Sequence, residues 1–276
     1  MFAELAPSSP SPTLYRGSLV QSRAEGGARR SYLIIFKRLG RLVTTATCRG
    51  LLVDMDGVLV DSTSAVARVW TRWAIKHNLE PESTVRLAHG RTSLASIQEL
   101  LPNADAAAHL AENDWMEQAE IEDVADVNAL PGAKELLAAL APGQLAVVTS
   151  ATRALAEVRL RAAGLWNHVH RIVTASDIQR GKPDPEPYQK GAAALGFAPQ
   201  DCIVIEDAPS GTLSGKAAGC RVLAVRTTTD DHALLAAGAN WIVNDCSSLR
   251  AFNHQEPDRL TLEMSLDEPP RQPKMH

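Results

Sequence analysis

Two aspartates one residue apart, Asp54 and Asp56, follow an apolar run in LLVDMDGVLVDS at residues 51–62. Carboxylates this close repel each other and raise each other's pKa unless a positive charge lies between them. Two more acidic residues, Glu206 and Asp207, end a second apolar run in CIVIEDAPSG. Oxygen ligands that converge on one crevice favour Mg²⁺ over zinc or copper. The spacing therefore predicts a divalent-cation site assembled from separate parts of the chain.

Groups of opposite character follow two further segments. Thr149 and Ser150 end VVTS ahead of an expected helix, and the N–H groups at a helix N-terminus bind anions. Lys182 lies in RGKPDPEPY, just before another expected helix. A lysine about 4 Å from a phosphoryl oxygen gains roughly 4 kcal/mol at an effective dielectric constant of about 20, before desolvation costs. Cation, lysine, hydroxyl and helix N–H groups together predict a site for a phosphoryl group.

Short buried strands that alternate with helices are predicted to position these residues. Runs of Val, Ile and Leu without polar alternation are typical of a parallel sheet covered on both faces. The alternation indicates an α/β fold with a Rossmann-like open parallel sheet, in which ligands bind at the carboxyl ends of the strands. The expected strands are 51–55, 144–150, 171–175, 202–207 and 221–225, with 241–243 as a possible short last strand.

One interval contains helices and no clear strand. The segment STSAVARVWTRWAIKHN has an apolar stripe at helical spacing. A second helix is TSLASIQELL, with Thr92 or Ser93 as its N-cap, and a third covers about 103–125. An all-helical insert here would lie over the carboxyl end of the first strand and could act as a lid. The predicted domains are an α/β core at 49–62 and 129–250 and a helical cap at 63–128.

Both ends of the chain are expected to be disordered. Residues 1–48 are rich in Ser, Pro, Gly and Arg, which favours a disordered leader or an extension from an upstream start codon. An organelle-targeting peptide is the alternative, because the segment is Arg- and Ser-rich and poor in acidic residues. The breaks at SPSP and EGGA argue against it. Residues 251–276 are polar with several prolines and are expected to be a disordered tail.

Composition limits the possible partners. Residues 1–50 hold eight of the 28 Lys and Arg and two of the 32 Asp and Glu, so the rest of the chain has 20 basic and 30 acidic residues. Such an acidic body argues against a nucleic-acid partner. No segment has the roughly 18 apolar residues needed to cross a membrane. Four widely spaced cysteines indicate a cytoplasmic protein without structural zinc or disulfides. A monomer or weak dimer is expected.

Four segments, in chain order, resemble the motifs of the haloacid dehalogenase-like hydrolase superfamily. They are DMDGV at 54–58, VVTS at 147–150, GKPDPEPY with Lys182, and IEDAPSG at 205–211. The resemblance covers about residues 50–245. The insert after the first motif is similar to the small helical cap of the beta-phosphoglucomutase-like subfamily. The segments AVARVWTRWAIKHNL and AHGRT further resemble the hexitol and sugar phosphatases related to glycerol-3-phosphatase and 2-deoxyglucose-6-phosphatase.

The resemblance implies a reaction and its catalytic residues. It implies a Mg²⁺-dependent phosphatase acting on a small sugar, sugar-alcohol or glycerol phosphate. Asp54 would attack phosphorus and form an aspartyl-phosphate, and Asp56 would act as general acid and then general base. Mg²⁺ would be held by Asp54, the backbone carbonyl of Asp56, and Asp207, with Glu206 in or beside that shell.

The resemblance also implies how the substrate is held. Ser150 and the backbone N–H of Ala151 would bind the phosphoryl oxygens, and Lys182 would balance the charge. His89 and Arg91 are the expected substrate contacts from the cap, with Trp70 as a further candidate. Simpler interpretations stay open for some of these residues, because Ser150 or Asp207 could merely cap a helix, and tryptophans more often form a hydrophobic core.

Three other functions stay open. Related phosphoglucomutases have a histidine twelve residues after the nucleophile, where this chain has Val66. A dehalogenase would use the same nucleophile without metal, but it has no leaving oxygen for Asp56 to protonate. A catalytically silent binding or regulatory protein could use the same scaffold, although every expected catalytic residue is present.

Overall fold

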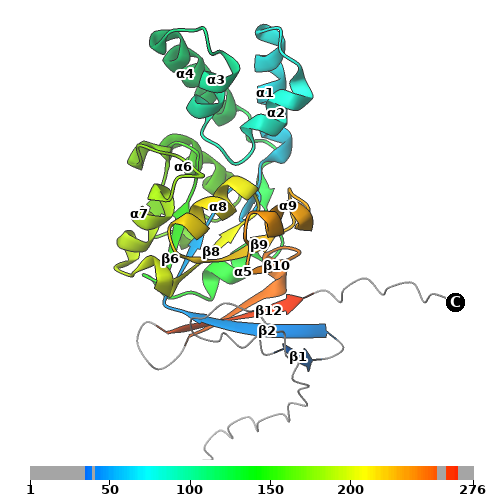
Figure 1. Cartoon of the computed structure of the whole chain (residues 1–276), viewed down its shortest axis with the longest axis vertical. Coiled ribbons are helices and arrows are strands. Elements are labelled where there is room, and N and C mark those ends of the chain that lie inside the picture. The colour runs from blue at the N-terminus through cyan, green and yellow to red at the C-terminus, as the bar shows by residue number, and fades with distance from the viewer. Residues whose placement is uncertain (1–34, 39–40, 254–258, 267–276) are drawn as a thin grey trace, which may run out of the picture.

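A parallel β-sheet lies at the centre of the computed structural model, which describes residues 35–38, 41–253 and 259–266 (Figure 1). In order across the sheet, its strands are β10 (Trp241–Val243), β9 (Arg221–Val225), β8 (Cys202–Glu206), β3 (Gly50–Val53), β6 (Leu145–Val148) and β7 (Ile172–Val173). All neighbouring strands pair parallel. The Rossmann-like α/β core expected from the sequence is confirmed. The edge strand β7 is shorter than predicted, because only two residues of the expected strand at 171–175 belong to it.

Helices cover both faces of this sheet, because successive strand residues point to opposite sides. Leu52 and Val148 belong to the side covered by α7 (Glu186–Leu195) and α8 (Pro209–Ala217). Leu51 and Val147 belong to the side covered by α5 (Ala133–Ala138) and α6 (Arg153–Ala162). The remaining core helices are α9 (Asp231–Ala236) and the short 3₁₀ turns Trp166–His168, Ala175–Asp177, Pro199–Asp201 and Cys246–Ser248.

A helical cap lies at one end of the molecule, above the core (Figure 1). Its helices are α1 (Thr63–Lys76), α2 (Pro81–Ala88), α3 (Ser93–Leu100) and α4 (Ala106–Glu122). A two-stranded sheet of β4 (Val60–Asp61) and β5 (Asn128–Ala129) lies where the chain leaves the core and returns. Trp73, Ile97 and Met116 form a separate apolar cluster, so the cap has a small core of its own.

The cap helices partly match the sequence prediction. Thr92 caps α3 as expected, with its hydroxyl accepting a hydrogen bond from the N–H of Ala95 at 3.3 Å. Helix α2 was not predicted. It starts at Pro81 and is capped by the carboxylate of Glu80. Glutamate is not one of the residues preferred at an N-cap, which is why the start of this helix was missed.

A second sheet lies at the end of the molecule opposite the cap (Figure 1). It is antiparallel, and its strands in order are β1 (Ile35–Arg38), β2 (Arg41–Cys48), β12 (Leu260–Leu266) and β11 (Leu249–Asn253). The predictions of a disordered leader at 1–48 and a disordered tail at 251–276 are therefore wrong for the residues in these strands. Apart from Arg259, the other residues of both segments lie outside the described residues.

The alternation of β12 explains why it is ordered. Leu260, Leu262 and Met264 are buried, whereas the residues between them are half-buried, as in a strand with one face on a core. These three side chains join the main apolar cluster of the parallel sheet. The strand was not predicted, because the polar residues between the apolar ones lower the hydropathy of the segment. In addition, a short single strand carries no local signal of the strand with which it pairs.

Shortening Leu262 is expected to destabilise the protein. Its side chain is fully buried in the main cluster, and Leu→Ala substitutions at such positions cost about 2–5 kcal/mol through lost burial and a residual cavity. Chemical denaturation of Leu262→Ala should show this loss. Thr45→Ala, at an exposed position on the neighbouring strand β2, is the control and should change stability by less than about 0.5 kcal/mol. An unchanged Leu262→Ala midpoint would show that the second sheet does not support the core.

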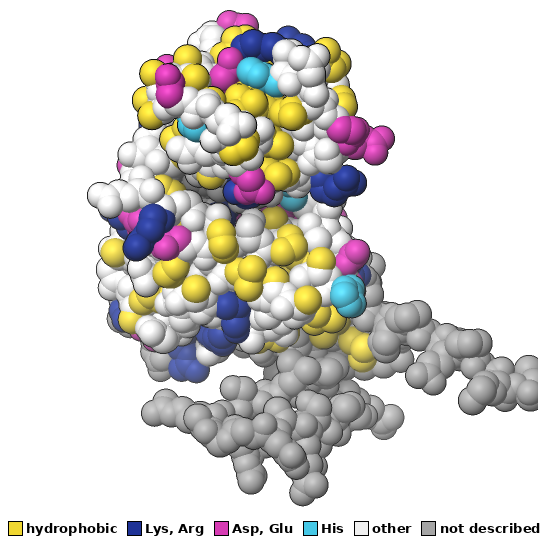
Figure 2. Space-filling model, turned by 45° about the horizontal axis from the view of Figure 1, so that its top comes forward, with side chains coloured by type: hydrophobic (Ala, Val, Ile, Leu, Met, Phe, Trp, Pro, Cys, Tyr) yellow, Lys and Arg dark blue, Asp and Glu magenta, His cyan; other side chains and the backbone are white. Residues whose placement is uncertain are grey.

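Several surface and chemical features bear on the expected partners. Among the described residues, no helix combines the length and apolar character needed to span a bilayer. On the face shown in Figure 2, Lys and Arg side chains are interspersed with acidic and uncharged ones.

All four cysteines are free and buried, and burial raises the pKa of Cys246 to about 12. At neutral pH this thiol therefore stays protonated and is a poor nucleophile.

Candidate active site

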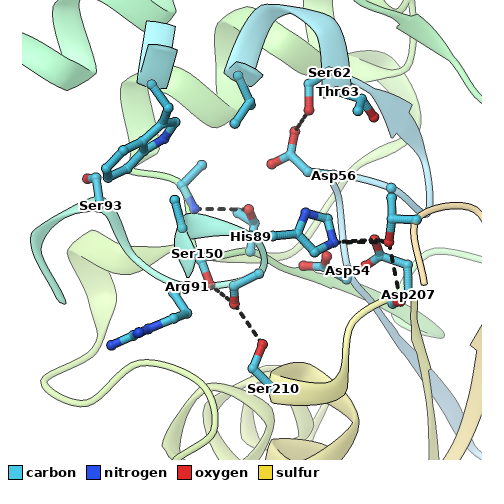
Figure 3. A pocket seen from close by; sticks show the side chains of 18 of the residues that line it. Asp54, Asp56, Ser62, Thr63, His89, Arg91, Ser93, Ser150, Asp207 and Ser210 are labelled. Atoms are coloured by element: carbon cyan, nitrogen blue, oxygen red, sulfur yellow. Dashed lines mark hydrogen bonds and ion pairs between the residues drawn. The ribbon is translucent and has the colours of Figure 1, made fainter. Parts of the chain in front are cut away.

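A cleft of about 690 Å³ lies between the cap and the carboxyl ends of the core strands (Figure 3). The core contributes Asp54, Asp56, Ser150, Ala151 and Asp207 to its lining, and the loop after α2 contributes His89 and Arg91. Trp70 from α1 also lines the cleft, although it is almost fully buried. Lys182 lies against Asp54. The residues expected to act together therefore do meet at one place.

Three carboxylates form the acidic centre of the cleft. Asp54 directly follows β3, and Glu206 and Asp207 lie at the end of the adjacent strand β8. One oxygen of each lies within 4.8 Å of the others. Two motif glycines make room for them. A Cβ on Gly57 would lie 2.0 Å from Asp207 Oδ2, and a Cβ on Gly211 would lie 1.7 Å from Glu206 Oε1.

Lys182 is the cation bound to this cluster. Its Nζ lies 2.7 Å from Asp54 Oδ1 and 2.6 Å from Glu206 Oε1, and all three side chains are buried. The lysine is presented by a loop before α7 in which the Lys182–Pro183 peptide bond is cis. Although burial opposes its charge, the neighbouring carboxylates raise the pKa of Lys182 above its usual value. The ammonium group is therefore charged at neutral pH.

Both oxygens of Glu206 are already occupied. Oε1 accepts from Lys182 and from the hydroxyl of Tyr188 at 2.7 Å, and Oε2 accepts from the backbone N–H groups of Asp207 and Ala208 at 2.9 and 3.1 Å. These contacts outweigh burial and keep the pKa of Glu206 below its usual value. Glu206 is thus a partner that holds Lys182, whereas Asp54 and Asp207 are the carboxylates with remaining coordination capacity.

The charge of the cluster fits a divalent cation. Three buried carboxylates face one lysine, and burial raises the pKa of Asp54 and of Asp207. Buried carboxylates without enough positive charge are unfavourable and tend to bind protons or metal ions. Their hard oxygen donors suit Mg²⁺. The residues present therefore fit the predicted ion.

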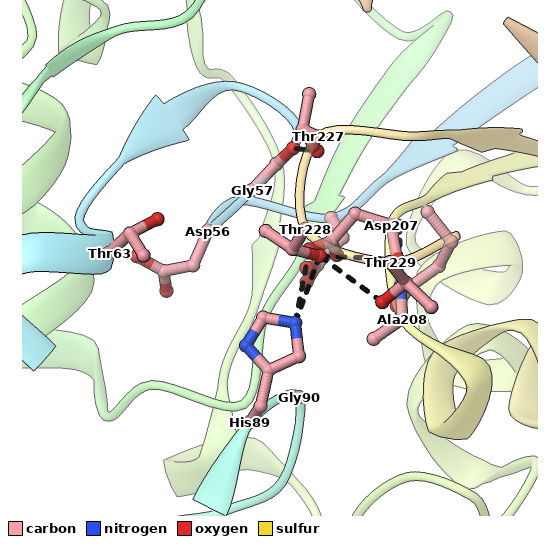
Figure 4. Close-up of polar contacts among 12 residues, drawn as sticks. Asp56, Gly57, Thr63, His89, Gly90, Asp207, Ala208, Thr227, Thr228 and Thr229 are labelled. Atoms are coloured by element: carbon pink, nitrogen blue, oxygen red, sulfur yellow. Dashed lines mark hydrogen bonds and ion pairs between the residues drawn. The ribbon is translucent and has the colours of Figure 1, made fainter. Parts of the chain in front are cut away.

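The loop after α2 connects the cap to this cluster. His89 Nε2 lies 3.0 Å from Thr228 Oγ1 and 3.4 Å from Asp207 Oδ2, and Thr228 also donates to Asp207 (Figure 4). The hydrogen bond to Asp207 raises the pKa of His89. Arg91 differs, because its guanidinium pairs with Glu99 of α3 at 2.7 Å and points away from the carboxylates (Figure 3).

The predicted phosphate-binding groups currently bind protein atoms. Ser150 Oγ lies 3.4 Å from the carbonyl oxygen of Gly90, which also accepts from Ser210 Oγ at 3.1 Å. The N–H of Ala151 donates to Thr149 Oγ1 at 3.1 Å. A cap carbonyl thus lies against the hydroxyl that the sequence analysis assigned to phosphate.

Asp56 lies on the side of the cleft next to β4, where the chain leaves the core for the cap. Its Oδ1 accepts from Ser62 Oγ at 2.5 Å and from Arg159 Nη1 at 3.1 Å. Arg159, on α6, also lies 3.4 Å from Glu120 of cap helix α4. Neither of the two partners of Asp56, nor the pairing of Arg159 with Glu120, was predicted from the sequence. Ser62 could have been noticed as a hydroxyl six residues after Asp56, but nothing local distinguishes Arg159 from the other arginines of α6.

The fold and the site define a hydrolase-like α/β protein with a helical cap over a carboxylate cluster. The family model described as haloacid dehalogenase-like hydrolase matches residues 51–225. The chain therefore belongs to this family, and the membership expected from its four motifs is confirmed. Strands β2, β11 and β12 lie outside the matched residues.

Several proteins that the chain resembles are named as phosphatases. The chain is 43% identical to hexitol phosphatase A of Escherichia coli over 185 residues, which is 66% of this chain and 85% of that protein. It is 31% identical to glycerol-1-phosphate phosphohydrolase 2 of Saccharomyces cerevisiae, over 72% of this chain and 83% of that protein. A solved hydrolase from Pseudomonas syringae matches with a TM-score of 0.65 at 26% identity, covering 72% of this chain and 94% of that one. The predicted class, a phosphoric monoester hydrolase, is confirmed.

Proposed function

We propose that the protein is a Mg²⁺-dependent phosphatase that hydrolyses the phosphate ester of a small sugar, sugar alcohol or glycerol. The convergence of Asp54, Asp207 and Lys182 at the carboxyl ends of the parallel strands carries this proposal. The likeness to a hexitol phosphatase and a glycerol-1-phosphate phosphohydrolase supports the substrate class. A cytoplasmic location and a monomeric or weakly dimeric state remain predictions.

Asp54 is the proposed nucleophile in the first step. Its carboxylate oxygen bonds to phosphorus while the bond between phosphorus and the ester oxygen breaks, and Asp56 gives its proton to the departing alcohol. Asp56 is suited to this because its side chain is 29% exposed, at the side of the cleft. Lys182, bound to Asp54, keeps the nucleophile oriented and offsets negative charge on the phosphoryl group.

The second step releases phosphate. Asp56, now ionised, takes a proton from water as the water attacks the phosphorus of the aspartyl-phosphate, and Asp54 departs as a carboxylate. Ser150 and the N–H of Ala151 would hold phosphoryl oxygens once they give up their contacts with Gly90 and Thr149. His89 and Arg91 would contact the part of the substrate nearest the cap.

Asp54 and Asp207 would hold Mg²⁺, together with the backbone carbonyl of Asp56. When bound, the ion supplies positive charge that polarises the phosphoryl group and orients it. It would also keep the Asp54 carboxylate ionised against the effect of burial, because a bound cation lowers the pKa of its ligands. Glu206 would support this site by holding Lys182.

Removal of divalent metal is expected to abolish phosphate release. We expect excess EDTA to lower turnover of sorbitol, mannitol, sugar and glycerol phosphates by about 100-fold or more, because the ion supplies several kcal/mol of transition-state stabilisation. Excess Mg²⁺ should restore it, and EDTA already saturated with Mg²⁺ is the control. Phosphate release that is insensitive to EDTA would contradict the proposal. Conversion of glucose 1-phosphate to glucose 6-phosphate without free phosphate would identify a mutase instead.

A further inference from the structure

A buried arginine lies between the cap and the core at the edge of the cleft. Arg159 is on α6, where its neighbours Leu155 and Leu160 are buried against the parallel sheet. Only 4% of its side chain is exposed. Arginine is rarely buried unless it is paired, because removing the guanidinium from water is costly. The pairing partners therefore indicate why the residue is there.

The guanidinium contacts one carboxylate of the core and one of the cap. Nη1 donates to Asp56 Oδ1 at 3.1 Å, and Nη2 lies 3.4 Å from Glu120 Oε2. Glu120 is itself buried and belongs to α4. All three side chains line the same cleft. Arg159 is thus a direct connection between the cap and the residue proposed as general acid.

The contacts to Asp56 are made to one of its two oxygens. Ser62, the residue before α1, and Arg159, on α6, both donate to Oδ1. Among the described residues, no hydrogen bond to Oδ2 is found. A carboxylate held through one oxygen from two directions is restricted in rotation, and the other oxygen stays available for proton exchange. Such orientation of a catalytic group can account for large factors in rate.

We propose that Arg159 is a positioning residue that holds Asp56 in the orientation for protonating the leaving alcohol and links this orientation to cap position through Glu120. The inference rests on the proposed function. In the step concerned, the bond between phosphorus and the ester oxygen breaks, its electron pair stays on that oxygen, and the proton comes from Asp56. An alkoxide is a strong base and requires this proton, whereas nitrophenolate is stable without it.

The test compares an alkyl ester, glycerol phosphate, with p-nitrophenyl phosphate. The quantity measured is kcat/KM, because it reports the difference between free enzyme and the transition state. For R159M we expect a loss of about 100-fold with the alkyl ester, within the range that general acid catalysis contributes, and of less than about threefold with the aryl ester.

Two further variants complete the design. R159K keeps the charge but lacks the planar fork of donors that can contact two carboxylates. We expect the same selective loss at smaller size, and this variant carries the test if R159M does not fold. R161M is the control, because Arg161 lies on the same helix but is 57% exposed and pairs with Glu157. It should leave both values of kcat/KM unchanged.

The outcomes separate this inference from the proposed function. Equal losses with both esters, or no loss with either, would overturn it. A rise in KM for glycerol phosphate with kcat kept would also overturn it, because Arg159 would then be a substrate contact. If the unsubstituted protein with Mg²⁺ released phosphate from none of the sugar, hexitol and glycerol phosphates, the proposed function itself would be wrong.

Discussion

Replacement of Asp54 by asparagine is expected to lower phosphate release by at least about 10⁴-fold, as loss of the nucleophile does in other covalent hydrolases. Asparagine has nearly the same shape but cannot attack phosphorus to form the intermediate. Folding should survive, because Lys182 keeps its ion pair with Glu206 at 2.6 Å. The measurement is single-turnover and steady-state phosphate release from a hexitol phosphate with Mg²⁺.

The control for this variant is Asp114→Asn, an aspartate exposed on cap helix α4. It should keep full activity. Covalent labelling adds a second check, because the unsubstituted protein should trap phosphate on Asp54 after rapid acid quenching and D54N should not. Asp54→Asn activity within tenfold of the unsubstituted protein would show that another residue attacks phosphorus.

Replacement of Lys182 by methionine is expected to reduce both activity and stability. The substitution leaves the buried carboxylates of Asp54 and Glu206 without their cation, and breaking such a pair costs about 3–5 kcal/mol. Phosphoryl transfer should also slow, because the positive charge beside the nucleophile is lost. Urea unfolding and kcat should be measured on the same preparation.

Lys190→Met is the matched control, because Lys190 lies on α7 with its side chain 44% exposed and in an ion pair with Glu186. Exposed pairs of this kind contribute about 0–1 kcal/mol, so little change is expected. A Lys182→Met protein as stable as the unsubstituted one would show that the two carboxylates are protonated in the folded state and need no cation.

The centre of the candidate site could be predicted because its residues are tied to strand ends. Asp54 directly follows the last residue of β3, and Asp207 directly follows the last residue of β8. Because these neighbouring strands are parallel, they end at the same edge of the sheet. Motif order and apolar runs therefore locate both residues without knowledge of side-chain packing. Lys182 does not lie at a strand end, but its position could be predicted from its motif, which runs into the first turn of α7.

The connections between cap and core could not be predicted. Arg159 and Glu120 lie on helices that each carry several charged residues, and a charged side chain normally faces water. Only docking of α4 against α6 brings them together and buries them. The partner of Asp207 shows the same difficulty, because Thr228 is 21 residues further along the chain, after β9.

The second sheet has a consequence for synthesis of the protein. Strand β12 pairs with β2, where Leu260 lies opposite Cys48, so two partners more than 200 residues apart complete one layer. A chain emerging from the ribosome presents β2 first and β12 only after more than 200 further residues. Until then, the backbone N–H and C=O groups on the edge of β2 that faces β12 have no strand partner. The second sheet is therefore expected to be completed only after all of the catalytic strands have been made.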